Sequence, residues 1–228
     1  MSDLVYFKKS KLDALADKIN EKCGGVEPIS LDEMVAKAED IRLIEMLESR
    51  TALGYAMAYS SLSTFPYFKV NETVKSMNYF CINSKFTNFP KLDTSKVKTF
   101  EYAFSNCYIK EITIDSSSAT NMIGAFSSNN YLVTISKLDV SKCVTADSLK
   151  NTFHYCTSLK NVSFVENSIH VSVSFAYCSL LSAESVQSII DGLATVTTAQ
   201  TITFYKDIAL SDEQKQIIND KGWTLVQA

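Results

Sequence analysis

The chain has 228 residues, a formal net charge of −3 and a hydrophobic content of 46%, enough to bury a core in one large domain or two small ones. Its six glycines and three prolines argue against a disordered or collagen-like chain. No basic stripe is present and no apolar run approaches the ~20 residues of a membrane-spanning helix, so we expect neither nucleic-acid binding nor membrane insertion.

Residues 1–50 carry the pattern of two helices. Apolar residues of the first fall at helical spacing until Gly24 and Gly25, a pair that stops helices. A capping box, Ser30-Leu-Asp-Glu33, begins the second, which we expect to end near Ser49. The candidate attachment or oligomerisation face comprises Leu12, Leu15, Ile19, Met34, Val35 and Ile41.

Residues 53–181 repeat one phrase at intervals of 22 to 27 residues. Each copy has an apolar anchor, a small or amide residue three places later, and then spaced apolar residues. The anchors are Met57, Phe80, Phe104, Phe126, Phe153 and Phe175, and the residues three places later are Ser60, Asn83, Cys107, Asn129, Cys156 and Cys178. One copy cannot bury its apolar residues alone, so we expect the copies to stack, with one short strand in each.

The phrase KLDTSKVKTFEYAFSNC at 91–107 resembles the bacterial surface-protein type of leucine-rich repeat, and the resemblance covers roughly residues 53–181. It implies an α/β repeat: a leucine-rich-repeat-type solenoid with an N-terminal helical segment and a C-terminal α/β cap. The expected domains are 1–50, the helical attachment or oligomerisation segment; 51–181, the solenoid of about five to six coils; and 182–228, the cap. The resemblance implies little about function, because this repeat is a reusable scaffold.

Residues 182–228 carry clear local signals. Ser182 is expected to begin a helix whose buried face holds Val186, Ile189, Ile190 and Leu193. The stretch TITFY at 201–205 predicts a strand. Ser211-Asp-Glu-Gln214 is a capping box that begins a second helix, ending near Gly222, and WTLV at 223–226 predicts the last strand.

Both ends of the chain resemble phage proteins. The ending with LSDEQKQIINDKGWTL is similar to the C-termini of repeat-bearing structural proteins of phages that infect gut bacteria. The phrase LDALADKINEKCGGVEPISLDEMVAKAEDI at 12–41 resembles a segment near the N-termini of phage tail and fibre proteins. This second resemblance implies that the N-terminal helices dock on other virion proteins.

No motif predicts catalysis. The chain lacks the Gly-x-Ser-x-Gly, P-loop, Gly-x-Gly-x-x-Gly and His-Glu-x-x-His phrases, and His154 is interpreted as a solvated or partly packed side chain. The carboxylates of Glu166, Asp191 and Asp207 have no evident partners, which disfavours a hydrolase. We therefore expect a protein that is not an enzyme and has no cofactor and no metal site.

Cysteine occupies one position in several copies. Cys107, Cys156 and Cys178 alternate there with serine and asparagine, which indicates a position for a small side chain. Copies stacked about 5 Å apart would allow a Cys156–Cys178 bridge, whereas Cys107 and Cys156 would be too far apart. We favour free buried thiols, and the absence of a Cys-x-x-Cys motif gives no support to a zinc site.

Tyrosines recur near the anchors. They either fill the core and its grooves or form an exposed row that binds sugar or protein, since tyrosine is a frequent recognition residue. The candidate recognition aromatics are Tyr67, Tyr108, Tyr131, Tyr155 and Tyr177.

The function expected from these features is that of a phage virion structural protein, a fibre, tail or decoration component that attaches to the host surface or to other virion proteins. We expect a homo-oligomer, with a trimer favoured, and a host surface protein or glycan as a further partner. The N-terminus lacks the h-region of a secretory signal, so we expect the chain either to act inside the cell or to leave by a route that needs no signal peptide, such as assembly into a virus particle. The alternative is a bacterial surface adhesin, a protein-binding repeat scaffold at the cell surface, which requires an export signal or anchor.

Overall fold

The structure is a computed structural model that describes residues 48–65 and 69–228. The chain divides into two compact parts, Met1–Ser49 and Arg50–Ala228, and the following description concerns the second part. The predicted attachment face formed by Leu12, Leu15, Ile19, Met34, Val35 and Ile41 lies outside the described residues. The three domain ranges expected from the sequence remain predictions.

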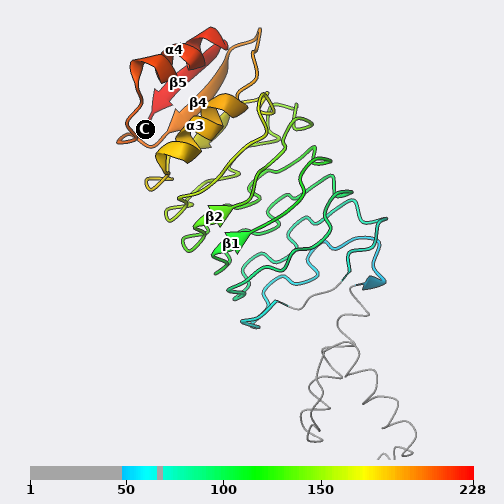
Figure 1. Cartoon of the computed structure of the whole chain (residues 1–228). Coiled ribbons are helices and arrows are strands. Elements are labelled where there is room, and N and C mark those ends of the chain that lie inside the picture. Colours follow the sequence, from blue (N-terminus) through cyan, green and yellow to red (C-terminus); the bar gives the residue numbers. More distant parts are fainter. Residues whose placement is uncertain (1–47, 66–68) are drawn as a thin grey trace, which may run out of the picture. The chain divides into compact units, whose positions relative to one another are not determined.

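Main-chain hydrogen bonds join consecutive repeat copies, which Figure 1 shows as loops lying next to one another. In each bond the amide of an anchor donates to the carbonyl just before the next anchor. The bonds are Met57 N to Phe80 O (2.8 Å), Cys81 N to Ala103 O (2.9 Å), Phe104 N to Ala125 O (2.9 Å) and Phe126 N to Thr152 O (3.1 Å). This pattern makes Cys81 the second anchor, so the predicted anchor Phe80 is wrong by one residue. We number the copies 1 to 6 by their anchors Met57, Cys81, Phe104, Phe126, Phe153 and Phe175.

Two residues in each of copies 1 to 5 have the left-handed backbone conformation. They lie two places before and two places after the anchor, at φ values between 49° and 60°. The positions before the anchor are Tyr55, Tyr79, Tyr102, Gly124 and Asn151, and those after it are Tyr59, Asn83, Asn106, Ser128 and Tyr155. A residue with positive φ reverses the local direction of the chain, so each anchor sits between two sharp turns.

The predicted fold class, a leucine-rich-repeat-type solenoid, is contradicted. Such a solenoid requires a strand in every copy. Within residues 48–65 and 69–228, the strands of copies 3 and 4 are only two residues long: β1 (Glu111–Ile112) in copy 3 and β2 (Thr134–Ile135) in copy 4. The described part is a small mixed α/β arrangement with two helices and two small parallel sheets, neither of them closed. Side-chain hydroxyls interrupt the main-chain pairing directly after β1, where Ile114 N donates to Ser136 Oγ (3.3 Å) and Asp115 N donates to Thr94 Oγ1 (2.7 Å), so the paired segment stays short. The N-terminal helical segment of this fold class lies outside the described residues.

The residue three places after the anchor has a small side chain that also acts as a hydrogen-bond donor. In copies 3 to 6 its side chain donates to the carbonyl of the preceding copy's anchor. The bonds are Cys107 Sγ to Cys81 O (2.9 Å), Asn129 Nδ2 to Phe104 O (2.6 Å), Cys156 Sγ to Phe126 O (3.0 Å) and Cys178 Sγ to Phe153 O (3.5 Å). In copy 2 the corresponding residue is Ser84, whereas the sequence prediction placed Asn83 there. We call this position the donor position.

The anchor rings form the centre of the core. Neighbouring centroids of Phe104, Phe126 and Phe153 lie 5.8 and 5.9 Å apart, and all three side chains are buried. The stack continues through Phe175 to Phe204, with centroid distances of 4.6 and 6.2 Å. Replacing such a buried ring by alanine typically costs about 3–5 kcal/mol. The repeat copies and the C-terminal elements therefore share one core.

The C-terminal elements build a three-stranded parallel sheet in the order β3 (Val173–Phe175), β4 (Gln200–Phe204) and β5 (Trp223–Gln227). Parallel neighbours need crossover connections, which are supplied by helices α3 (Ala183–Gly192) and α4 (Asp212–Asp220). The two helices contact each other, and α4 also contacts β5. The strands predicted at 201–205 and 223–226 are thus confirmed.

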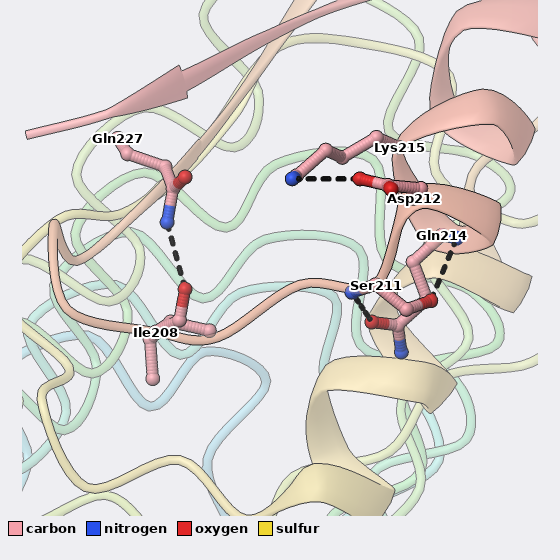
Figure 2. Close-up of polar contacts among 6 residues, drawn as sticks. All are labelled: Ile208, Ser211, Asp212, Gln214, Lys215 and Gln227. Atoms are coloured by element: carbon pink, nitrogen blue, oxygen red, sulfur yellow. Dashed lines mark hydrogen bonds and ion pairs between the residues drawn. The ribbon is translucent and has the colours of Figure 1, made fainter.

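Local capping signals determine where both helices begin. The Ser182 side chain accepts a hydrogen bond from Ser185 N at the start of α3. Figure 2 shows the capping box of α4, in which Ser211 Oγ accepts from Gln214 N (3.1 Å) and Gln214 Oε1 accepts from Ser211 N (3.0 Å). Both predicted helix starts are confirmed, because each signal acts within a single turn.

Lys221 closes the opposite end of α3. Its ammonium group donates to Ile190 O and Asp191 O at 3.1 Å and to Leu193 O at 2.6 Å. The last carbonyls of a helix have no partner within the helix, so a cation there satisfies them and complements the helix dipole. Burial lowers the pKa of Lys221. This contact fixes α3 to the connection between α4 and β5.

Candidate functional site

Two pairs of exposed tyrosines form the candidate site. In the first pair, the side chains of Tyr108 and Tyr131 are 46% and 52% exposed. Their rings stack with centroids 5.0 Å apart and an angle of 16° between their planes. Each tyrosine immediately precedes a buried apolar residue, Ile109 or Leu132. The burial of these neighbours fixes the backbone and leaves the phenol rings on the surface.

The second pair consists of Tyr155 and Tyr177, with a ring-centroid distance of 4.2 Å. The His154 ring meets both rings edge-on, at 4.3 Å from Tyr155 and 4.8 Å from Tyr177. A hydrogen bond between the phenol groups raises the pKa of Tyr177 above 10.0. Tyr177 therefore stays uncharged around pH 7, and each tyrosine of the pair has an apolar ring and a polar hydroxyl group.

Hydrogen bonds join the chain beside one pair to the chain beside the other. Thr157 Oγ1 donates to Asn130 Oδ1 (3.2 Å), and Ser158 Oγ donates to Asn130 O (2.6 Å). Asn130 directly precedes Tyr131, and Thr157 lies two residues after Tyr155. The structure thus gives ring contacts within each pair and polar contacts between their loops. We call Tyr108, Tyr131, Tyr155 and Tyr177 the recognition surface. The fifth predicted recognition aromatic, Tyr67, lies outside the described residues.

A second row of stacked tyrosines was absent from the predicted recognition residues. Tyr55 and Tyr79 have centroids 4.7 Å apart and nearly parallel planes, and Tyr79 and Tyr102 follow at 5.5 Å. The Tyr79 hydroxyl donates to Glu101 Oε1 (3.2 Å). Desolvation, followed by the negative charge of Glu101, raises the pKa of Tyr79. All three tyrosines lie two residues before an anchor, a regularity that appears in the sequence once Cys81 replaces Phe80 as the second anchor.

The described cysteines are buried and carry free thiols: Cys81, Cys107, Cys143, Cys156 and Cys178. Burial raises the pKa of Cys143 and Cys156 to about 12, which leaves both protonated at neutral pH. Two of these thiols, Cys81 and Cys107, lie in contact, with sulfur atoms 3.8 Å apart. This pair cannot be recognised when Phe80 is taken as the second anchor, because Cys81 then falls outside the repeated positions.

Within residues 48–65 and 69–228, no three histidine, cysteine or acidic side chains lie close enough together to hold a metal ion. Three hollows in the same part of the chain are lined by residues other than those of the recognition surface. One is lined by Lys91, Asp93 and Asp115, and another by hydroxyl residues of β3 and β4. The candidate site is therefore an exposed aromatic surface, suited to contact with another surface rather than to enclosing a small molecule.

No protein-family model, curated protein or solved structure matches this chain. Among the described residues, no helix has the length and apolar content needed to cross a bilayer. Function must therefore be inferred from the residues and their geometry.

Proposed function

We propose that the chain is a phage virion structural protein, a fibre, tail or decoration component, that attaches to a host surface protein or glycan through the recognition surface. The observation that carries this proposal is the exposure of two pairs of contacting tyrosine rings, one stacked and one tilted, on loops held by a buried core. Tyrosine supplies a large contact area and a polar hydroxyl while losing little conformational entropy. The resemblance of both chain ends to phage structural proteins supports the virion assignment.

Stacking prepares these side chains for binding. A tyrosine that is already packed against a neighbour loses less side-chain freedom when a partner covers it. Each tyrosine also carries a hydroxyl group, so hydrogen bonds as well as apolar contacts are available. The contact is expected to be weakly dependent on salt, because the phenol groups carry no charge.

Binding to host cells tests the attachment role. The full chain, fluorescently labelled, is titrated onto cells of the host strain, and the variant Tyr108→Ser/Tyr131→Ser is compared with it. We expect at least a tenfold weaker binding of the variant, equivalent to about 1.4 kcal/mol, because exposed aromatics dominate such contacts. The matched control is Tyr55→Ser, which alters an exposed tyrosine of the other row. Unchanged binding by the double variant would contradict the proposal.

Two further measurements separate the remaining choices. Protease treatment of the cells removes binding if the receptor is a protein and leaves it intact if the receptor is a glycan. Mass spectrometry of purified phage particles tests the virion assignment, and absence of the chain from particles would favour the surface adhesin instead.

We also propose that the N-terminal segment docks on virion proteins and assembles a trimer. Light scattering of the full chain and of a variant lacking residues 1–49 tests this oligomeric state.

A further inference from the structure

Two buried thiols from neighbouring copies lie in contact. Cys81 is the anchor of copy 2, and Cys107 occupies the donor position of copy 3. Their side chains are 0% and 2% exposed, and their sulfur atoms are 3.8 Å apart. They are separated by 26 residues in the sequence, so a bond between them would tie one copy directly to the next.

The surroundings of the two thiols differ. Cys107 Sγ lies 2.9 Å from Cys81 O and 3.4 Å from Ser84 Oγ, whereas Cys81 Sγ donates to Ala103 O at 3.3 Å. A hydrogen bond from the Cys81 thiol lowers the pKa of Cys107, while burial raises the pKa of Cys81. Cys107 is therefore the better nucleophile of the pair, since the thiolate is the reactive form.

The other thiols in consecutive copies make the same donor-position bond as Cys107, but their pKa values are raised rather than lowered. Cys156 Sγ donates to Phe126 O and Cys178 Sγ donates to Phe153 O, each to the anchor of the copy before its own. Burial raises the pKa of both thiols, and the proximity of Cys156 raises that of Cys178 further. The raised pKa values keep both cysteines protonated, which disfavours disulfide exchange.

We propose that Cys81 and Cys107 are a site of oxidative modification, closing to an intramolecular disulfide when the chain meets a small-molecule disulfide such as oxidised glutathione. The Cys107 thiolate attacks one sulfur of oxidised glutathione, forming a mixed disulfide and releasing one glutathione thiolate. Cys81 then loses its proton and attacks the Cys107 sulfur, releasing the second glutathione. Two protein thiols are oxidised, one glutathione disulfide is reduced to two thiols, and the two protons pass to the leaving thiolates.

Burial determines the rate and the effect of this step. Oxidised glutathione reaches Cys107 only when copies 2 and 3 separate locally, so we expect closure over minutes to hours. Once closed, the bond limits that separation and restricts the unfolded chain. A chain that moves from a reducing cytoplasm to an oxidising exterior would become more stable after release. The chemistry itself does not depend on the proposed attachment function.

Peptide mapping of the full chain tests the proposal. The reduced, folded chain is incubated with oxidised glutathione, remaining thiols are alkylated, and the peptides are identified by mass spectrometry. We expect one intramolecular link, between Cys81 and Cys107, with unchanged circular dichroism and an unfolding midpoint raised by about 6–12 °C. Dithiothreitol should reverse both effects.

Matched variants keep the result interpretable. Cys107→Ser should abolish the link and the midpoint shift, whereas Cys156→Ser, which alters the same donor position in another copy, should retain both. Oxidation of the urea-unfolded chain should yield mixed pairings, which would show that the folded geometry makes the selection. A folded chain that forms no link, or that links Cys156 to Cys178 instead, would overturn the proposal.

Discussion

Removing the side chain of Asn129 tests whether donor-position hydrogen bonds stabilise the stacked copies. The side chain is fully buried; its Nδ2 donates to Phe104 O (2.6 Å) and Phe126 O (2.9 Å), and its Oδ1 accepts from Cys107 N (2.7 Å). In Asn129→Ala, Phe126 O keeps its bond from Cys156 Sγ, but the Phe104 carbonyl and the Cys107 amide lose the partner that Asn129 supplies.

The expected magnitude follows from those two groups. A buried polar group left without its partner costs about 1–3 kcal/mol, so the loss of two partners in Asn129→Ala should lower the free energy of unfolding by about 2–6 kcal/mol. At about 2–4 °C per kcal/mol for a folded part of this size, the thermal midpoint should fall by about 4–24 °C. Asn129→Cys places the residue of copies 3 and 5 at this position. It restores a donor for Phe104 O but no acceptor for Cys107 N, so its stability should lie between those of the wild type and the alanine variant.

Urea unfolding measures this difference, with far-UV circular dichroism and the fluorescence of Trp223, the only tryptophan, as probes. The control is Asn130→Ala, the same substitution at the next residue, which is exposed and should change stability by less than about 0.5 kcal/mol. If Asn129→Ala unfolds at the same urea concentration as Asn130→Ala, the donor-position bonds contribute no net stability. If Asn129→Cys is less stable than Asn129→Ala, a hydrogen-bond donor at this position does not stabilise the fold, which would contradict the reasoning.

Three further outcomes are expected. Burial raises the pKa of Cys156 from 9.0 to about 12, so the folded chain retains a proton that the unfolded chain loses. Stability should therefore fall as pH rises above about 9, by up to about 1.4 kcal/mol per pH unit for this thiol, and a urea series with Cys156→Ser should show a smaller slope. Lys221→Met removes the donor to three carbonyls at the end of α3 and should cost about 2 kcal/mol in urea unfolding, whereas Lys215→Met, which alters an exposed ion pair, should cost less than about 0.5. Gly124 has φ of 57°, and a Cβ added there would overlap the Tyr102 ring; Gly124→Ala should cost about 1–3 kcal/mol in thermal unfolding, and adding Tyr102→Ala should recover the steric part.

The C-terminal elements could be predicted because their signals are local. Ser182 and Ser211 each cap a helix through contacts three residues away, and the buried residues of α3 follow the helical period. Strand β4 alternates buried Ile202 and Phe204 with less buried threonines. None of these features depends on where the rest of the chain lies, so a window of a few residues is sufficient to identify them.

The strand expected in every copy could not be excluded from the sequence. Ile109, Ile112 and Ile114 are all buried, as a strand facing the core would require, yet only Glu111–Ile112 is extended and paired. Spaced apolar residues also suit a chain that turns repeatedly against a core. Asparagine and glycine favour the left-handed conformation, so it could be expected at Asn83, Asn106 and Gly124. Tyr55 and Tyr79 have the same conformation, but tyrosine has no such preference and gives no signal of it in the sequence.

The recognition surface was also only partly predictable from the sequence. The recurrence of tyrosine near the anchors identified Tyr108, Tyr131, Tyr155 and Tyr177 as candidates. Recurrence alone cannot distinguish exposed tyrosine rings from buried ones. Their exposure, their pairing and the separate row beginning at Tyr55 depend on the register between copies. A one-residue error at the second anchor was enough to hide that row.

The sequence alone determined the helix starts, the late strands, the repeated phrases and the residue types that they share, because each is encoded in neighbours along the chain. The tertiary structure decided the fold class, the true anchor at Cys81, the hydrogen-bonding role of the donor position and the contact between Cys81 and Cys107. Each of these depends on which residue of one copy faces which residue of the next, and hydrogen bonds between copies set that register only when the chain is folded.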